Sequence, residues 1–315
     1  MLSGVDRIEP SLRWNCCFST SLVNQIVLAA IDVHPFPAVF SNSNSICMLD
    51  QTPSCSTSFA AACRQESPNR VPGSVIIASY NVHKCVGTDG RFDPQRVGNV
   101  IRELSADIIA LQEVDERTGR RQGLLDLNTL RRETDLVSAH TPENLGPHGW
   151  HGNLILARKG VVQAVNLVRL PGLEPRGALI VDLEIEGVVL RVIAAHFGLL
   201  RRSRTKQANA LLEATRSVLR PTILLGDLNE WRVHSRSSLL ALLPHFGPIH
   251  TVLPSFPSRF PMLALDRILA KPPSLISSLE VHHTSLSRIA SDHLPIKARL
   301  NLQGIRQLHL QPDYL

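Results

Sequence analysis

Six apolar runs of strand-forming residues between residues 75 and 295 each adjoin a carboxylate, amide or imidazole side chain. The runs at 75–80, 108–112, 189–195 and 222–225 lead to Asn81, Glu113, His196 and Asp227, and two shorter stretches lead to Asp266 and to Asp292 with His293. A polar residue at one strand end is ordinary. Six in order, all of types that bind metals or move protons, predict a functional site on a β-rich scaffold.

Helical signals lie between these strands. Asp93, followed by a proline, is a helix start, and apolar residues at helical spacing continue to Leu104. Two further helices are expected at 206–219 and 237–243, and a β-hairpin is expected over 179–195. The alternation of helices and strands predicts a mixed α/β class.

Two short segments point to the chemistry. Asp227 and Asn229 are two residues apart after an apolar strand, so they would face the same side of it. A single Asp-x-Asn is otherwise a turn or a helix cap. Asp292 next to His293 places an acid beside an imidazole, and such a pair can hold a metal and bind a phosphate or move a proton. These are parts that a metal-dependent phosphoester hydrolase needs.

The composition fits a globular enzyme. The chain has 315 residues, of which 43% are hydrophobic and 19% charged, enough for one large domain plus a tail. It lacks an apolar run of the roughly 18 or more residues that a membrane-spanning helix needs. The net charge of +6 favours a polyanionic substrate such as nucleic acid, a phospholipid headgroup or an inositol phosphate. At 4%, aromatic residues argue against a stacking platform for single strands.

The first part of the chain differs from the rest. Residues 1–72 are rich in Ser and Asn, show no sustained period and carry five of the six cysteines. We expect this part to be a disordered or non-native leader, with an N-terminal targeting segment as the alternative. The remaining chain holds only Cys85, which suits a reducing compartment and favours a cytoplasmic location.

From about residue 75 to about residue 302 the chain resembles the endonuclease/exonuclease/phosphatase superfamily, which includes DNase I. The resemblance rests on Ser79–His83, Leu111–Asp115, His151–Asn153, Ala195–Phe197, Gly226–Asn229, Leu265–Ile268 and Ser291–Pro295. It implies a four-layer α/β sandwich, in which two packed mixed β-sheets are flanked by helices. We expect a catalytic domain at 73–303, a C-terminal tail at 304–315, and a monomer.

The resemblance also implies a metal site. The family residues that match Asn81 and Glu113 hold the metal, and Asp292 is expected to complete or support the site. Mg²⁺ is the expected cofactor, with Mn²⁺ as the alternative, because Mg²⁺ prefers oxygen ligands and keeps several waters. His83 departs from the pattern, since several members have an acidic or amide residue there, and this leaves a second metal ligand at that position open.

The catalytic roles follow from the matching positions. Asp227 is expected to orient and activate the attacking water, and Asn229 to hydrogen-bond a phosphoryl oxygen. His293 is expected to transfer a proton or stabilise the phosphate, with Asp266 holding its ring. The alternative for Asp266 is a surface ion pair with the adjacent Arg267.

Three further positions bear on the substrate. His196 is expected to be catalytic and to donate to the phosphate as charge develops there. It matches the DNase I, sphingomyelinase and 5-phosphatase branches, whereas the exonuclease III branch tends to have Tyr in a different local motif, which disfavours an abasic-site repair nuclease. Asn153 and Arg176 are expected to bind substrate, although a loop arginine such as Arg176 is commonly only solvated.

The sequence therefore predicts a Mg²⁺-dependent phosphodiesterase or phosphatase in which an activated water attacks a phosphoester. A DNA or RNA endonuclease of the same fold is the first alternative, because basic residues at 201–206 follow His196. A catalytically silent binding module is the second.

Overall fold

The computed structural model describes residues 74–116, 123–139, 149–158, 160–216, 220–233 and 235–309. The expected leader at 1–72 lies outside these ranges, as does the chain after residue 309. No helix within them is both long enough and apolar enough to span a bilayer.

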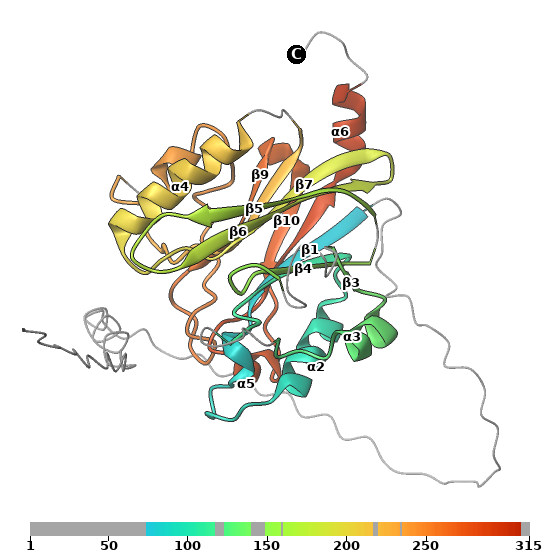
Figure 1. The fold of residues 1–315 in the computed structure, drawn as a ribbon, viewed down its shortest axis with the longest axis vertical. Helices are drawn as coiled ribbons and strands as arrows, with labels where there is room; N and C mark the ends of the chain where they lie inside the picture. Colours follow the sequence, from blue (N-terminus) through green and yellow to red (C-terminus); the bar gives the residue numbers. More distant parts are fainter. Residues whose placement is uncertain are drawn as a thin grey trace, which may run out of the picture. The chain divides into compact units, whose positions relative to one another are not determined.

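Two mixed β-sheets form the centre of the fold (Figure 1). The first has the order β10 (Ile276–Val281), β11 (Ile296–Asn301), β1 (Ser74–Asn81), β2 (Ile108–Gln112), β4 (Leu154–Ala157) and β3 (Val137–Ser138). The second has the order β5 (Val161–Leu170), β6 (Arg176–Ile185), β7 (Val188–Ala195), β8 (Thr222–Asp227) and β9 (Asp266–Lys271). In each sheet one pair is parallel, β1 with β2 and β7 with β8, and the other pairs are antiparallel.

Helices cover the outer faces of the sheets. The α-helices are α2 (Pro94–Leu104), α3 (Leu127–Thr134), α4 (Arg201–Thr215), α5 (Ser287–Ala290) and α6 (Leu302–His309). Short 3-10 turns are η1 (His83–Cys85), η2 (Leu240–Leu242) and η3 (Pro273–Leu275). Figure 1 shows α2 and α3 against the first sheet and α4 against the second.

Three buried clusters correspond to these layers. One lies between the sheets and joins residues such as Ile77 and Val192. A second lies under α2 and contains Val97 and Ile109, and a third lies under α4 and contains Leu211 and Leu224. Apolar side chains are thus buried away from water on both faces of each sheet. The predicted four-layer sandwich is confirmed.

Several local predictions are confirmed. The helix predicted from Asp93 is α2, whose first turn is capped by the Asp93 carboxylate accepting a hydrogen bond from the Arg96 amide. The hairpin is β6–β7. The helix predicted at 206–219 begins earlier, at Arg201, because the charged first turn carries no apolar period. The helix predicted at 237–243 contains only η2. The expected domain end at residue 303 falls within α6.

Strand direction corrects one expectation. Asp266 begins β9, and Asp292 and His293 precede β11, so these residues do not end apolar strands. Because β9 runs antiparallel to β8 and β11 antiparallel to β1, their beginnings lie at the edge where β1 and β8 end. All six strands therefore still bring their polar residues to one edge.

Candidate active site

Asp227 is the centre of a buried polar cluster that joins the two sheets. Its Oδ2 accepts a 3.0 Å hydrogen bond from Nδ2 of Asn81, which comes from the other sheet. The same oxygen lies 3.4 Å from Nε2 of His196 and 3.8 Å from Nε2 of His293. The four side chains are almost fully buried. The structure thus brings together residues that are far apart in the sequence, as predicted.

The approach of β8 to β7 requires a glycine before Asp227. Gly226 has φ of +144°, and a Cβ there would lie 1.9 Å from the carbonyl oxygen of Ala195. A larger residue would push β8 away from β7. This glycine therefore fixes where the Asp227 carboxylate enters the cluster.

Backbone strain gathers at the same edge. Glu113 and Asn229 have φ of +57° and +51°, and the three residues of η1 also have positive φ. Positive φ is costly for a residue with a side chain, and such conformations persist only where neighbouring structure enforces them. At Asn229 two hydrogen bonds hold this backbone conformation. The backbone amide of Asn229 donates to Oδ1 of Asp227, and Nδ2 of Asn229 donates to the carbonyl of Phe197.

Asp266 and His293 form a close pair. Nδ1 of His293 lies 2.8 Å from Oδ2 of Asp266, and that oxygen also accepts a 2.5 Å hydrogen bond from the Ser255 hydroxyl. The Phe256 ring packs against the imidazole with the ring centroids 4.9 Å apart. Arg267 instead donates to the carbonyls of Thr251 and Glu230.

Burial and neighbouring charges shift the pKa values of this cluster. Burial alone would lower the pKa of His293, but the carboxylates of Asp266 and Asp227 raise it well above its usual value. Burial raises the pKa of Asp227 to about 6, although the charge of His293 opposes this shift. The pKa is thus raised for both groups, which favours an Asp227 carboxyl that can take up a proton and a His293 imidazole that keeps its proton.

The predicted metal ligands lie at neighbouring strand ends, at the end of β1 (Asn81), after β2 (Glu113) and before β11 (Asp292). Oδ1 of Asn81 accepts the His83 amide at 3.0 Å, and Nδ1 of His83 lies 3.7 Å from Oδ1 of Asp292. Nζ of Lys84 lies 4.0 Å from Oε2 of Glu113. In the described part of the chain, no three His, Cys, Asp or Glu side chains form a metal-binding group. The donor set of two carboxylates and one amide suits a hard cation that keeps water ligands.

A cavity of about 90 Å³ opens beside the cluster, lined by Glu113, Asp115, His151, Gly152, Glu174, Pro175, Arg176 and His196. Arg176 is buried there and makes two hydrogen bonds to Oε2 of Glu174, at 2.7 and 3.0 Å. Its Nη1 lies 2.9 Å from Nδ1 of His196. Arg176 is therefore held in the site and is not a solvated loop residue.

Asn153 has a different setting. Its Nδ2 donates to the carbonyls of Trp150 and Gly177, which ties the loop before β4 to β6. Both amide hydrogens therefore serve backbone carbonyls, and substrate binding by Asn153 stays a prediction.

Sequence reasoning missed the side chains that support this cluster. Glu230 is fully buried, its Oε2 accepts from the Ser238 amide and hydroxyl, and it pairs with Arg204 of α4. The Ser291 hydroxyl donates to the carbonyl of Asn81. The sequence signal for Glu230 is its position directly after Asn229.

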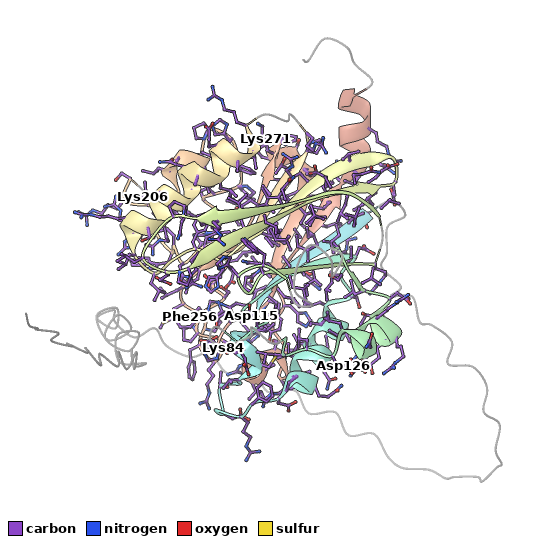
Figure 2. All side chains as sticks on the ribbon, viewed as in Figure 1. Lys84, Asp115, Asp126, Lys206, Phe256 and Lys271 are labelled. Atoms are coloured by element: carbon purple, nitrogen blue, oxygen red, sulfur yellow. The ribbon has the colours of Figure 1, made fainter. Side chains whose placement is uncertain are left out.

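The site occupies one end of the two sheets. Figure 2 shows Lys84, Asp115 and Phe256 at this end, whereas Lys271, the last residue of β9, lies at the other. β9 begins at the site with Asp266, so it spans the distance between the two ends.

Comparison with known proteins agrees with this arrangement. Residues 78–293 match the model of the Endonuclease/Exonuclease/phosphatase family. The chain belongs to this family.

Individual relatives are more distant. Uncharacterized protein YbhP of Escherichia coli K12 is 27% identical over 257 residues, which cover 73% of this chain and 97% of YbhP. A Beutenbergia cavernae endonuclease/exonuclease/phosphatase structure is similar with a TM-score of 0.56 and 20% identity, covering 72% of this chain and 71% of that one. The Bacteroides thetaiotaomicron mannosyl-6-phosphatase Bt3783 has a TM-score of 0.51 and 18% identity, covering 71% and 98%. At these identities the structural matches establish the shared fold.

Proposed function

We propose that this chain is a Mg²⁺-dependent hydrolase of phosphoester bonds. The observation that carries the proposal is the position of His293, whose ring lies between the carboxylates of Asp266 and Asp227. Asn81 from the other sheet is bonded to the same Asp227 oxygen that faces His293. A base, a charged donor and oxygen ligands for a cation thus meet at one edge.

Asn81, Glu113 and Asp292 would hold the cation, with Mn²⁺ as the alternative to Mg²⁺. When bound, the cation would offset negative charge on the phosphoryl oxygens. The Lys84 ammonium lies near the Glu113 carboxylate. The proposed metal ligand Glu113 therefore also has a positively charged neighbour within the chain.

The chain's own groups would supply the proton transfers. Asp227 accepts a proton from the attacking water, and the bond from Asn81 orients its carboxylate for this step. Its pKa of about 6 suits a base that works near neutral pH. His293, kept charged by Asp266, donates toward the phosphoester as charge develops on its oxygens.

Substrate oxygens would be held from the cavity side. Arg176 presents a guanidinium beside His196, and guanidinium groups match phosphate geometry. The side-chain amide of Asn229 donates one hydrogen to the carbonyl of Phe197, and its second hydrogen would bond a phosphoryl oxygen.

Hydrolysis of bis-p-nitrophenyl phosphate with and without EDTA tests the proposal. We expect turnover that EDTA abolishes and Mg²⁺ restores. Glu113→Gln exchanges a charged ligand for a neutral one of similar size, so we expect loss of most turnover and of Mg²⁺ binding by calorimetry. Glu184→Gln, at an exposed position of β6, is the matched control. Unchanged Mg²⁺ binding in Glu113→Gln, with turnover within about twofold, would refute the metal assignment.

A substrate panel separates the classes of hydrolase. It compares nucleic acid, phospholipid headgroup and inositol phosphate, each as a monoester and as a diester where both exist. An endonuclease remains the second candidate, because Arg201, Arg202 and Lys206 are exposed at the start of α4 directly after His196. A protein that binds but turns over no member of the panel would be a silent binding module.

A further inference from the structure

Exposed apolar side chains are concentrated on the loops that surround the site. Of 13 large apolar residues that are exposed in the described chain, seven lie around the site, six of them on loops and Ile289 in the short helix α5: Leu173, Leu199, Leu200, Trp231, Phe260, Met262 and Ile289. Single exposed apolar residues are normal on a protein surface, but this concentration at one edge is not. We call these seven residues the apolar rim.

One part of the rim is attached directly to the catalytic residues. Phe260 and Met262 are 72% and 50% exposed and lie on a small hairpin closed by the bridge between Phe256 and Leu263. At its base, Phe256 packs on the ring of His293. The hairpin amide of Ser258 donates to the carbonyl of Asp292 at 2.7 Å. The hairpin tip therefore projects beside the mouth of the site.

The other part of the rim flanks the opposite side of the cluster. Leu199 and Leu200 follow the strand that ends before His196, and Leu173 precedes Arg176. Trp231 follows Asn229, and the guanidinium of Arg232 lies 4.4 Å from its ring centroid. Apolar tips thus flank the catalytic cluster on loops from several strands.

Most segments that carry the rim have positive charge only, whereas the Leu173 loop holds Glu174, which pairs with Arg176. Segments 199–206, 231–238, 255–262 and 284–291 contain eight Arg or Lys residues and no Asp or Glu. Arg204 is buried against Glu230, but Arg259 and Arg288 are exposed beside Phe260 and Ile289. Arg288 also donates to the carbonyl of Arg259, which joins the hairpin to α5. Protruding apolar tips interleaved with cations complement an anionic bilayer, since the tips enter the headgroup region while the cations meet the phosphates.

We propose that the apolar rim docks this domain on the surface of an anionic phospholipid bilayer, with the site facing the headgroups. A single-stranded nucleic acid would use the cations but gives no role to Leu173, Met262 or Ile289, since its recognition relies on stacking aromatics. Docking does not require hydrolysis, so this proposal and the proposed function fail separately.

The test measures binding of the full chain to vesicles of phosphatidylcholine with about one third phosphatidylglycerol. Burying an exposed side chain as large as Phe stabilises association by roughly 1.5–3 kcal/mol, or about 10- to 150-fold. We expect Phe260→Ser to weaken vesicle binding at least tenfold. Adding Met262→Ser to this variant should weaken vesicle binding further. Val161→Ser is the matched control, because Val161 is 64% exposed, a fraction between those of Met262 and Phe260, but begins β5, about 30 Å along the strand from its site end. We expect it to change binding less than twofold.

Further arms locate the contact and exclude the rival. Arg259→Gln should weaken binding to anionic vesicles about fivefold and leave binding to pure phosphatidylcholine unchanged. Hydrogen exchange should slow in peptides over 255–263 on vesicles and stay constant over 161–170. Turnover of bis-p-nitrophenyl phosphate by Phe260→Ser should stay within twofold of the parent.

Three results would overturn the proposal. The first is vesicle binding that Phe260→Ser leaves unchanged, and the second is hydrogen exchange over 255–263 that vesicles do not slow. The third is a single-stranded oligonucleotide that binds more tightly than vesicles and loses affinity in Phe260→Ser, which would assign the surface to nucleic acid. Vesicle binding without any turnover would leave the docking surface standing and reject the proposed hydrolase.

Discussion

Replacing Asp266 by Asn tests whether Asp266 and His293 act as one unit. The change removes the negative charge that accepts from Nδ1 of His293 at 2.8 Å and keeps the side-chain size. A hydrogen bond to a charged group contributes about 1.5–3 kcal/mol. At 1.36 kcal/mol for each factor of ten, Asp266→Asn should lower kcat about 10- to 150-fold. The variant should also lower the pKa of His293, because the Asp266 charge that most stabilises the protonated imidazole is gone while the effect of burial remains.

The partner variant sets the scale. His293→Ala removes the donor itself and should lower kcat by about 10²–10⁴-fold, as for other acid–base groups. If Asp266 works through the ring, Asp266→Asn adds little in the His293→Ala background, so the double variant resembles His293→Ala. Ser255→Ala is the control, because it removes a neutral donor to the same oxygen and leaves the charge of Asp266 and its contact with His293 in place.

The assay is kcat on bis-p-nitrophenyl phosphate for the four variants and the parent, with melting temperatures to exclude unfolding. NMR titration of the His293 ring supplies a readout that a purely structural role would not move. The reasoning is refuted if Asp266→Asn costs the same factor with and without His293. An unchanged pKa of His293 in Asp266→Asn would refute it as well.

Three other predictions address the base, the leader and the core. Because burial raises the pKa of Asp227 to about 6, kcat/KM should fall as the pH drops through 6 and protonates the base. Asp227→Asn should lower kcat by about 10²–10⁴-fold and abolish this fall of kcat/KM at low pH. A rise in KM with unchanged kcat would instead mark Asp227 as a binding residue. Deleting residues 1–70 should keep activity and melting temperature, and a melting point many degrees lower would show that the segment packs on the domain. Burial raises the pKa of Cys85 to about 12, so peptide mapping should find it unmodified by iodoacetamide at pH 7.5 until the protein is denatured, and rapid labelling of the native chain would contradict its buried position.

The parts of the fold that the sequence predicts best are those with a local period. The helix from Asp93 carries its own cap, and the β6–β7 hairpin carries the Glu186-Gly187 turn between two apolar runs, so neighbouring residues alone specify them. The start of α4 is different. Arg204 is polar in the sequence yet buried in the structure, because Glu230 from another loop neutralises it. No period reveals such a pairing before the fold is known.

The candidate site divides in the same way. The types and order of its residues are visible in the sequence, since each lies beside an apolar run. The direction of β9 and β11 is not visible, because an apolar run reads alike whether its polar neighbour precedes or follows it. Sheet pairing with β8 and β1 decides that Asp266 and His293 reach the site from strand beginnings. A site at one edge was therefore predictable, and the strand ends that build it were not.

The strained backbone explains why the supporting shell matters to function. A positive φ at Glu113 or Asn229 costs roughly 1–3 kcal/mol each, so neither residue would hold its position alone. At Asn229 the cost is offset by the bond from its amide to Asp227 and by its own bond to Phe197. The next residue, Glu230, fixes the loop to α4 through Arg204. Each of these contacts joins elements that are distant in the sequence, so the placement of the catalytic groups is a property of the packed sheets and not of any single motif.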